Sequence, residues 1–191
     1  VRLVGSEMCI RDSSYMDPKS KQKGISVAKS PYKQYKNPNW SNYKITGTYV
    51  NSIVALQDAV AKGADEALIL DNDGYISEGS GENIFFLKDG LIMTPTTKNC
   101  LNGITRQSVI EIAKDLGHKV EEGDWSYEHI LECDEAFFTG TAVEVTPITK
   151  IDGKIISNGT VGSITKEIQT NYENAVLGTD NNSRNWLTYI E

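Results

Sequence analysis

Residues 67–94, ALILDNDGYISEGSGENIFFLKDGLIMT, are short apolar runs separated by turn sequences. The first run, 67–70, is fully apolar, and Asn72-Asp73-Gly74 after it is a typical hairpin turn. Two further strands, with a glycine in the turn between them, are predicted at 84–87 and 91–94. Consecutive strands joined by tight turns predict a sheet at the centre of the fold.

Helices are predicted on either side of this stretch. Apolar positions three and four residues apart indicate one helix from Tyr49 to Lys62, stopped by Gly63, and a second from Gly103 to Leu116. The remaining predicted elements are a strand at 24–28, a short helix near 127–131, a strand-rich stretch over 135–156 and a closing helix at 161–177. Strands and helices interleave without a strict βαβ rhythm, so we expect an α+β fold with a mixed or barrel-like sheet and flanking helices.

The composition excludes several classes of protein. The chain has 191 residues, of which 39% are hydrophobic, and its net charge of -7 opposes binding to nucleic acid or anionic lipid. No apolar run approaches the roughly 20 residues of a membrane-spanning helix. The three cysteines, Cys9, Cys100 and Cys133, form no metal-ligand pattern with the two histidines. We therefore expect no metal and a cytoplasmic location.

Polar or small residues occupy four segments where a core would require apolar ones: 41–49, 77–83, 102–106 and 139–146. Each segment has an ordinary structural explanation. The first holds a lysine that could be solvated, the second could be a bulged sheet corner, the third a plain helix start and the fourth a kink in a strand. Any functional interpretation therefore depends on the four segments serving one ligand.

The functional interpretations of the four segments converge on one ligand. The helix start at Gly103-Ile104-Thr105 offers backbone N–H groups and a positive dipole end to a phosphate. The turn Gly140-Thr141-Ala142 can hold a phosphate or a carboxylate through its amides. Lys44, beside small residues, could lose its proton on desolvation and form a Schiff base with an aldehyde. Glu78 could keep a basic ring nitrogen protonated. These groups together suit an aldehyde cofactor that carries a phosphate and a basic ring.

Four motifs carry a family resemblance. KITGTY at 44–49, SEGSGENIF at 77–85, LNGITR at 101–106 and TGTAVEVTP at 139–147 resemble, in order, the signatures of class IV pyridoxal-phosphate aminotransferases. They are most similar to those of the branched-chain amino acid aminotransferases. Order and spacing agree through about Ser14 to Glu191, with a family-like tail at 186–189.

The resemblance implies a role for each residue around the cofactor ring. Lys44 would form the internal aldimine with pyridoxal 5'-phosphate and move the proton between the substrate Cα and the cofactor C4′. Tyr49 would donate a hydrogen bond to the cofactor O3′, and Glu78 would pair with the pyridinium nitrogen. Leu101 would pack on the ring.

The resemblance also implies how the phosphate and the substrate are held. Ile104 and Thr105 would bind the phosphate at the helix start, and Thr141 would complete that site. The amides of Thr141 and Ala142 would face the substrate carboxylate. Glu82 and Glu144 are interpreted as structural, because a buried carboxylate beside a tight turn more often accepts bonds from backbone donors.

The resemblance further predicts the domain organisation. Residues 1–13 are interpreted as a non-native leader and residues 14–191 as the large cofactor domain. Family members carry a smaller N-terminal domain that supplies an arginine to the phosphate and groups to the substrate pocket, and nothing before Ser14 resembles it. We therefore expect this chain alone to be inactive, and the full-length protein to be a homodimer or larger homo-oligomer.

The leading functional hypothesis is transfer of the amino group of Leu, Ile or Val to 2-oxoglutarate. Two alternatives share the fold: a D-amino acid aminotransferase and a 4-amino-4-deoxychorismate lyase. A third is a folded fragment without catalytic activity. The sequences Gly81-Glu82-Asn83 and Gly140-Thr141-Ala142 favour the branched-chain group over the first two.

Overall fold

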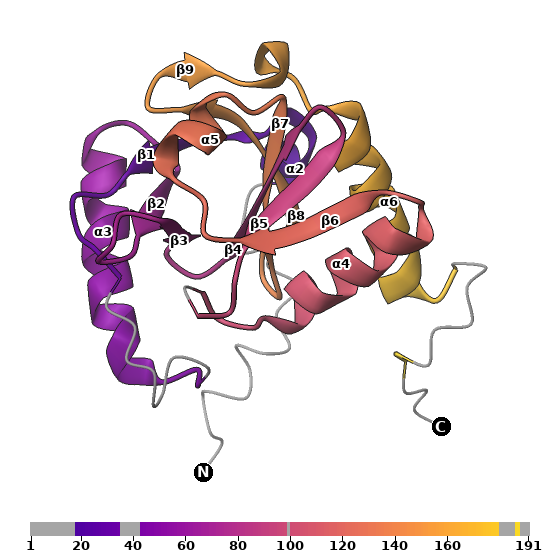
Figure 1. Cartoon of the computed structure of the whole chain (residues 1–191), viewed down its shortest axis with the longest axis horizontal. Helices are drawn as coiled ribbons and strands as arrows, with labels where there is room; N and C mark the ends of the chain where they lie inside the picture. The colour runs from indigo at the N-terminus through magenta and orange to yellow at the C-terminus, as the bar shows by residue number, and fades with distance from the viewer. Residues whose placement is uncertain (1–17, 35–42, 99, 180–185, 188–191) are drawn as a thin grey trace.

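The computed structural model describes residues 18–34, 43–98, 100–179 and 186–187 (Figure 1). The leader predicted at 1–13 lies outside the described residues, as do positions 188–189 of the tail motif. Within the described residues, every helix is too short or too polar to cross a lipid bilayer.

The secondary structure confirms the predicted strands and helices in order and adds a short helix at Pro18–Lys23 that was not predicted. The strands are β1 Ile25–Lys29, β2 Glu66–Leu70, β3 Ile76–Glu78, β4 Asn83–Lys88, β5 Leu91–Pro95, β6 Lys119–Gly123, β7 Glu135–Gly140, β8 Glu144–Ile151 and β9 Lys154–Ile155. The helices are α2 Pro18–Lys23, α3 Tyr49–Ala61, α4 Ile104–Asp115, α5 Tyr127–Leu131 and α6 Ser163–Leu177, with short 3-10 turns η1 Thr46–Thr48 and η2 Ser157–Gly159.

The strands form one curled, mixed sheet in the order β3-β2-β1-β8-β7-β4-β5-β6, with β9 paired to β8 (Figure 1). β1 runs parallel to β2 and to β8, and β5 runs parallel to β6, whereas the other pairs are antiparallel. Parallel neighbours need a crossover connection, which α3 provides between β1 and β2 and α4 between β5 and β6. The expected α+β class with a mixed sheet is therefore confirmed.

Both faces of the sheet are covered, which explains the continuous apolar runs in the sequence. Along β4, Ile84 and Phe86 belong to one core cluster, while Phe85 and Leu87 belong to a second cluster on the opposite face. Phe85 stacks on Phe137 of β7 with ring centroids 5.0 Å apart.

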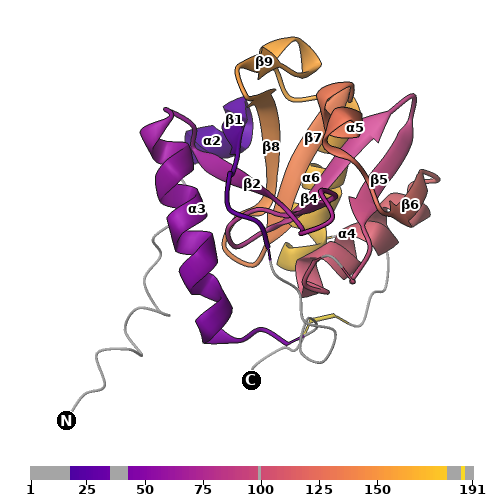
Figure 2. The same ribbon diagram turned by 60° about the vertical axis from the view of Figure 1, so that its left-hand side comes forward.

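The helices divide between two regions of this sheet. α3 packs on β1 and β2, whereas α4 and α6 pack on each other and on the sheet around β7 (Figure 2). Val109 of α4 and Ile168 of α6 are buried with Phe85 and Phe137. The first turn of α4 is thereby fixed beyond the carboxyl end of β5, close to the start of β4.

Candidate active site

Leu101, in the segment between β5 and α4, is bound on both sides by polar side chains. The Glu78 carboxylate accepts a hydrogen bond from the Leu101 amide, with 2.9 Å between Oε2 and N. The Asn83 side chain donates to the Leu101 carbonyl, with 2.7 Å between Nδ2 and O. Glu78 ends β3 and Asn83 begins β4, so the ends of two strands fix the chain just before α4 begins.

Gln34 orients the other oxygen of Glu78. Its amide nitrogen Nε2 lies 3.1 Å from Glu78 Oε1. Asn51, near the start of α3, donates from Nδ2 to Gln34 Oε1 and to the Lys33 carbonyl, each at 3.2 Å. Gln34 is buried. These bonds connect the first turns of α3 to the Glu78 carboxylate. Neither amide was predicted from the sequence, since a lone Gln or Asn gives no local signal of such a contact.

The start of α4 is open to an anion. Its N-cap is Gly103, which provides no side-chain cap, and the first turn contains no acidic residue. The first N–H groups of a helix have no acceptor within the helix. A Cβ at position 103 would lie 2.3 Å from Asn83 Oδ1, so the close approach of Asn83 requires a glycine. Thr105 is buried in this turn and Ile104 is exposed.

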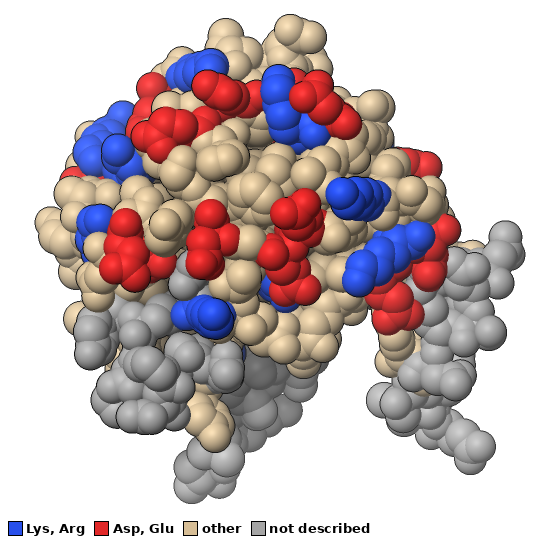
Figure 3. All heavy atoms as spheres, in the orientation of Figure 1, with Lys and Arg blue, Asp and Glu red and all other residues tan. Residues whose placement is uncertain are grey.

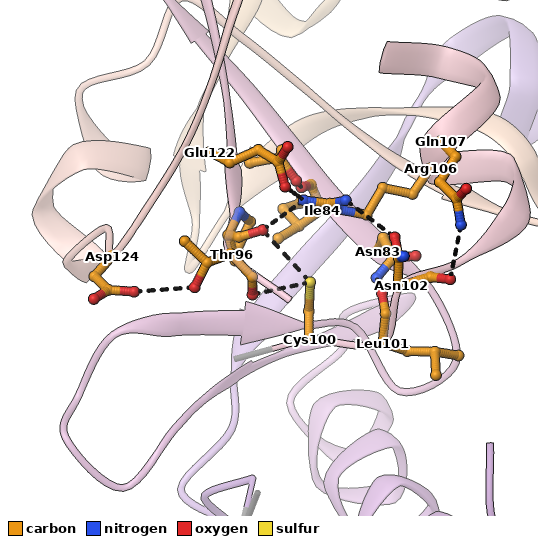
Figure 4. Close-up of polar contacts among 12 residues, drawn as sticks. Asn83, Ile84, Thr96, Cys100, Leu101, Asn102, Arg106, Gln107, Glu122 and Asp124 are labelled. Carbon is orange, nitrogen blue, oxygen red and sulfur yellow. Dashed lines mark hydrogen bonds and ion pairs between the residues drawn. The ribbon is translucent and has the colours of Figure 1, made fainter. Parts of the chain in front are cut away.

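Arg106 ties this first turn to the sheet (Figure 4). Its buried guanidinium donates from Nη2 to the Pro95 carbonyl at 2.9 Å and to Glu122 Oε2 at 2.5 Å. The thiol of Cys100 lies 3.5 Å from the same Pro95 carbonyl and 3.5 Å from the Thr96 carbonyl. The end of β5, the start of α4 and β6 are thus held together. Arg106 was part of a predicted motif but had no predicted role.

The connection from β7 to β8 brings a second group of candidates to this place. Thr139 is directly opposite Asn83 in the β4–β7 ladder, and opposed residues of an antiparallel pair point to the same face. The Thr139 hydroxyl is buried and has no hydrogen-bond partner among the described residues. Gly140 is half-buried, whereas Thr141 and Ala142 are exposed. The turn is therefore accessible beside an unsatisfied hydroxyl.

Lys44 and Tyr49 lie at the start of α3. Lys44 is exposed, and its Nζ lies 5.9 Å from the centroid of the Tyr49 ring. The desolvation predicted for Lys44 is therefore not supplied by the described residues of this chain. A cavity of about 700 Å³ adjoins this region and is lined by Tyr32, Gln34, Ile45 and Val54, among others. It places open space beside Gln34, the residue that orients Glu78.

The structure thus brings Glu78, Leu101 and the 103–105 helix start together, with Gly140 on the neighbouring strand. Asn51 joins α3 to this group through Gln34, whereas Lys44 is exposed before η1 and its Nζ lies over the ring of Tyr49. Glu144, interpreted as structural, forms an ion pair with Lys21 at 2.6 Å. Acidic and basic side chains are interspersed on the face seen in Figure 3.

Comparisons with known proteins bear on this arrangement. The sequence model of the family described as Amino-transferase class IV matches residues 5–151. A branched-chain-amino-acid aminotransferase of Pseudomonas aeruginosa is 43% identical over 93% of this chain and 58% of its own length. The Escherichia coli K12 enzyme of that name is 40% identical over 77% of this chain and 48% of its own length.

Solved structures give the same result. A branched-chain amino acid aminotransferase from Thermobaculum terrenum, in its PLP-bound holo form, matches with a TM-score of 0.85 and 34% identity, over 91% of this chain and 57% of that one. A branched-chain enzyme from Escherichia coli matches with a TM-score of 0.87 and 35% identity, over 91% of this chain and 58% of that one. The chain therefore spans about half the length of the relatives it matches. The chain belongs to the class IV aminotransferase family.

Proposed function

We propose that this chain is the cofactor-binding part of a pyridoxal-phosphate-dependent branched-chain amino acid aminotransferase. The observation that carries the proposal is the linkage of Glu78 to the open start of α4 through Leu101, at 2.9 Å from the carboxylate to the amide. It places a carboxylate and an anion-binding helix start on either side of one short segment. A ligand with a basic ring nitrogen and a phosphate needs both groups.

The residues present fit this cofactor. The unpartnered, buried hydroxyl of Thr139 and the uncapped α4 are polar groups that a bound anion or its hydration water would satisfy. Ile104 and Thr105 would hold the phosphate, and Thr141 would add a further donor from the β7–β8 connection. The holo form of the Thermobaculum terrenum relative supports this choice of cofactor.

The side chains of this chain have distinct tasks in the proposed reaction. When bound, pyridoxal phosphate supplies an electron sink for charge that develops at the substrate Cα. Glu78, held by Gln34 and Leu101, would keep a proton on the ring nitrogen. Lys44 would hold the cofactor through its primary amine and would carry a proton to and from the substrate Cα. Tyr49 would hydrogen-bond the cofactor O3′.

Substrate recognition is assigned to the Gly140-Thr141-Ala142 turn, whose amides would bind the substrate carboxylate. We propose that a smaller N-terminal domain covers Lys44 and supplies an arginine to the phosphate. The exposure of Lys44 and the greater length of the relatives support this. Arg106 is the one arginine among the described residues, and its guanidinium is bonded to Pro95 and Glu122. We also propose that the full-length protein is a cytoplasmic homo-oligomer.

Turnover assays test this function. The chain is joined behind the N-terminal part of the Pseudomonas relative, and the fusion is incubated with pyridoxal phosphate. L-Leucine with 2-oxoglutarate, D-alanine with 2-oxoglutarate, and aminodeoxychorismate are supplied separately. We expect glutamate formation with L-leucine alone. Preference for D-alanine or for aminodeoxychorismate would assign the chain to one of the other two activities of this fold.

A further inference from the structure

Two buried carboxyl groups, Glu66 and Glu82, line the same cavity and lie outside the proposed cofactor contacts. Each residue is only 7% exposed. Glu66 begins β2, and Glu82 immediately precedes β4. Among the described residues, neither carboxyl forms an ion pair with a lysine, arginine or histidine. Two carboxylates that share one buried site repel each other, and a single proton held by the pair relieves that repulsion.

The turn between β3 and β4 is wrapped around this pair. Ser80 donates to Glu66 from its backbone nitrogen at 3.2 Å and from its hydroxyl at 3.0 Å. The Gly81 nitrogen donates to Glu82 Oε2 at 2.9 Å. A Cβ at Gly79 would lie 2.9 Å from Glu82 Oε2 and 2.9 Å from the Phe138 ring. The positions of Glu82 and Phe138 therefore leave no room for a side chain at residue 79 of this turn.

The charged residues that line the cavity beside the pair are all acidic. This cavity, of about 280 Å³, is lined by Asp65, Glu66 and Glu82 together with uncharged residues of α2, α3, β1, β7 and β8. Asp65 accepts bonds from Ser26, and Glu78 adds repulsion from the far side of the turn. Burial and the neighbouring Glu66 raise the pKa of Glu82 to about 7, and burial raises the pKa of Glu66. The shared proton is consequently lost close to neutral pH.

The turn also sets the position of two site residues. Glu78 lies directly before it and Asn83 directly after it, and these two side chains bind opposite sides of Leu101. We propose that Glu66 and Glu82 are positioning residues whose shared proton fixes turn 79–82 and, through it, the separation of Glu78 and Asn83 at Leu101. When the proton leaves, the two like charges repel each other. The turn then no longer fixes the separation of Glu78 and Asn83. The consequence for catalysis rests on the proposed function of Glu78.

The test is an NMR titration of the cofactor-free, 15N-labelled chain of 191 residues. The amide signals of Ser80, Gly81 and Leu101 are followed from about pH 5.5 to about pH 9. We expect all three to shift together with a midpoint near pH 7. Glu82→Gln should abolish the shared transition, because an amide keeps a donor beside Glu66 at every pH. Glu66→Gln should do the same and serves as the second variant if Glu82→Gln does not fold. Glu132→Gln, an exposed control, should leave the midpoint unchanged.

Two results would overturn the inference. A pH transition in the amide signals of Ser80 and Gly81, but not in that of Leu101, would confine the effect of the pair to its own turn. A Leu101 transition that persists in both Gln variants would assign that transition to a group other than this pair. Because the experiment uses no cofactor, either result is distinct from a failure of the proposed aminotransferase function, which would appear only in the turnover assays.

Discussion

The Glu78 carboxylate and the Leu101 amide are joined by a 2.9 Å hydrogen bond that connects the last residue of β3 to the segment leading into α4. Gln34 occupies the other carboxylate oxygen at 3.1 Å. The carboxylate is therefore held from two sides by neutral donors while it remains half-buried. A group held in this way is preorganised to stabilise a proton on a bound ring without moving during the reaction.

Glu78→Gln should lower turnover far more than it weakens cofactor binding. The amide oxygen still accepts the Leu101 N–H, while its NH2 group no longer accepts the bond from Gln34, and a neutral amide does not stabilise the ring proton. In the fused protein we expect kcat to fall by about 10²- to 10³-fold, with cofactor affinity changed by less than about tenfold. Glu121→Gln, on the exposed side of β6, is the matched control. If Glu82→Gln had this phenotype and Glu78→Gln did not, the motif would be assigned in the wrong register.

Gly103→Ala should weaken binding of the phosphate specifically. Its Cβ would displace the Asn83 side chain, which costs the bond from Asn83 to Leu101 and shifts the helix start. Affinities for pyridoxal phosphate and for pyridoxal, which lacks the phosphate, are compared in the fused protein. We expect the preference for the phosphorylated form to fall about tenfold, or roughly 1.4 kcal/mol. Gly81→Ala, where a Cβ meets nothing within 4 Å, should keep the full preference for pyridoxal phosphate over pyridoxal. Equal losses for both ligands in Gly103→Ala would argue against a phosphate site at α4.

Glu122→Ala should cost more stability than its exposed position suggests. The Arg106 side chain is 2% exposed and that of Glu122 is 45% exposed, so removing the carboxylate leaves a buried guanidinium without its counter-charge. We expect the free energy of unfolding to fall by about 2 to 3 kcal/mol. The double variant Arg106→Met/Glu122→Ala should lose at least about 1 kcal/mol less than the sum of the single losses. Urea denaturation measures the free energy of unfolding of Glu122→Ala, Arg106→Met and the double variant. Strictly additive losses would refute the coupling between Arg106 and Glu122.

Stability should fall as pH rises from about 4.5 to about 7. The Glu82 carboxyl has a pKa of about 7 in the fold against an ordinary value of 4.5, so the native state holds more protons than the unfolded state in this window. The contribution of the raised pKa to the free energy of unfolding is therefore fully present below about pH 4.5 and fully lost above about pH 7. Its size is about 3 kcal/mol at most.

Urea denaturation at several pH values measures this loss. Glu82→Gln should lack this part of the pH dependence, so its unfolding free energy should rise relative to that of the unsubstituted chain as pH increases. Parallel curves for the two proteins between pH 4.5 and pH 8 would remove Glu82 as the source.

Local sequence signals were sufficient to predict most of the fold. The alternation of apolar runs with glycine turns gave β4 and β5, and the period of three to four residues gave α3, which begins at Tyr49 as expected. The parallel pairing of β1 with β8 could not be predicted from local signals, because most of the chain separates these two strands. Their register depends on long-range packing.

The site was predictable to the extent that its chemistry is local. Glu78 and the Gly103 helix start could be proposed as site residues because a turn or a helix start surrounds each within a few residues, and their roles stay predictions. Gln34, Asn51 and the anchoring role of Arg106 could not, since their contacts join segments distant in sequence. The environment of Lys44 depends on groups other than the described residues, so its desolvation stays a prediction.

The most direct measurement of the central claim is covalent trapping of the cofactor. The fused protein is incubated with pyridoxal phosphate and reduced with borohydride, and the labelled peptide is mapped by mass spectrometry. We expect one modified residue, Lys44, with far weaker labelling in the unfused chain. The label should disappear in Lys44→Ala and persist in Lys62→Ala, an exposed lysine at the other end of α3. Label spread evenly over surface lysines, or unchanged by Lys44→Ala, would contradict the account.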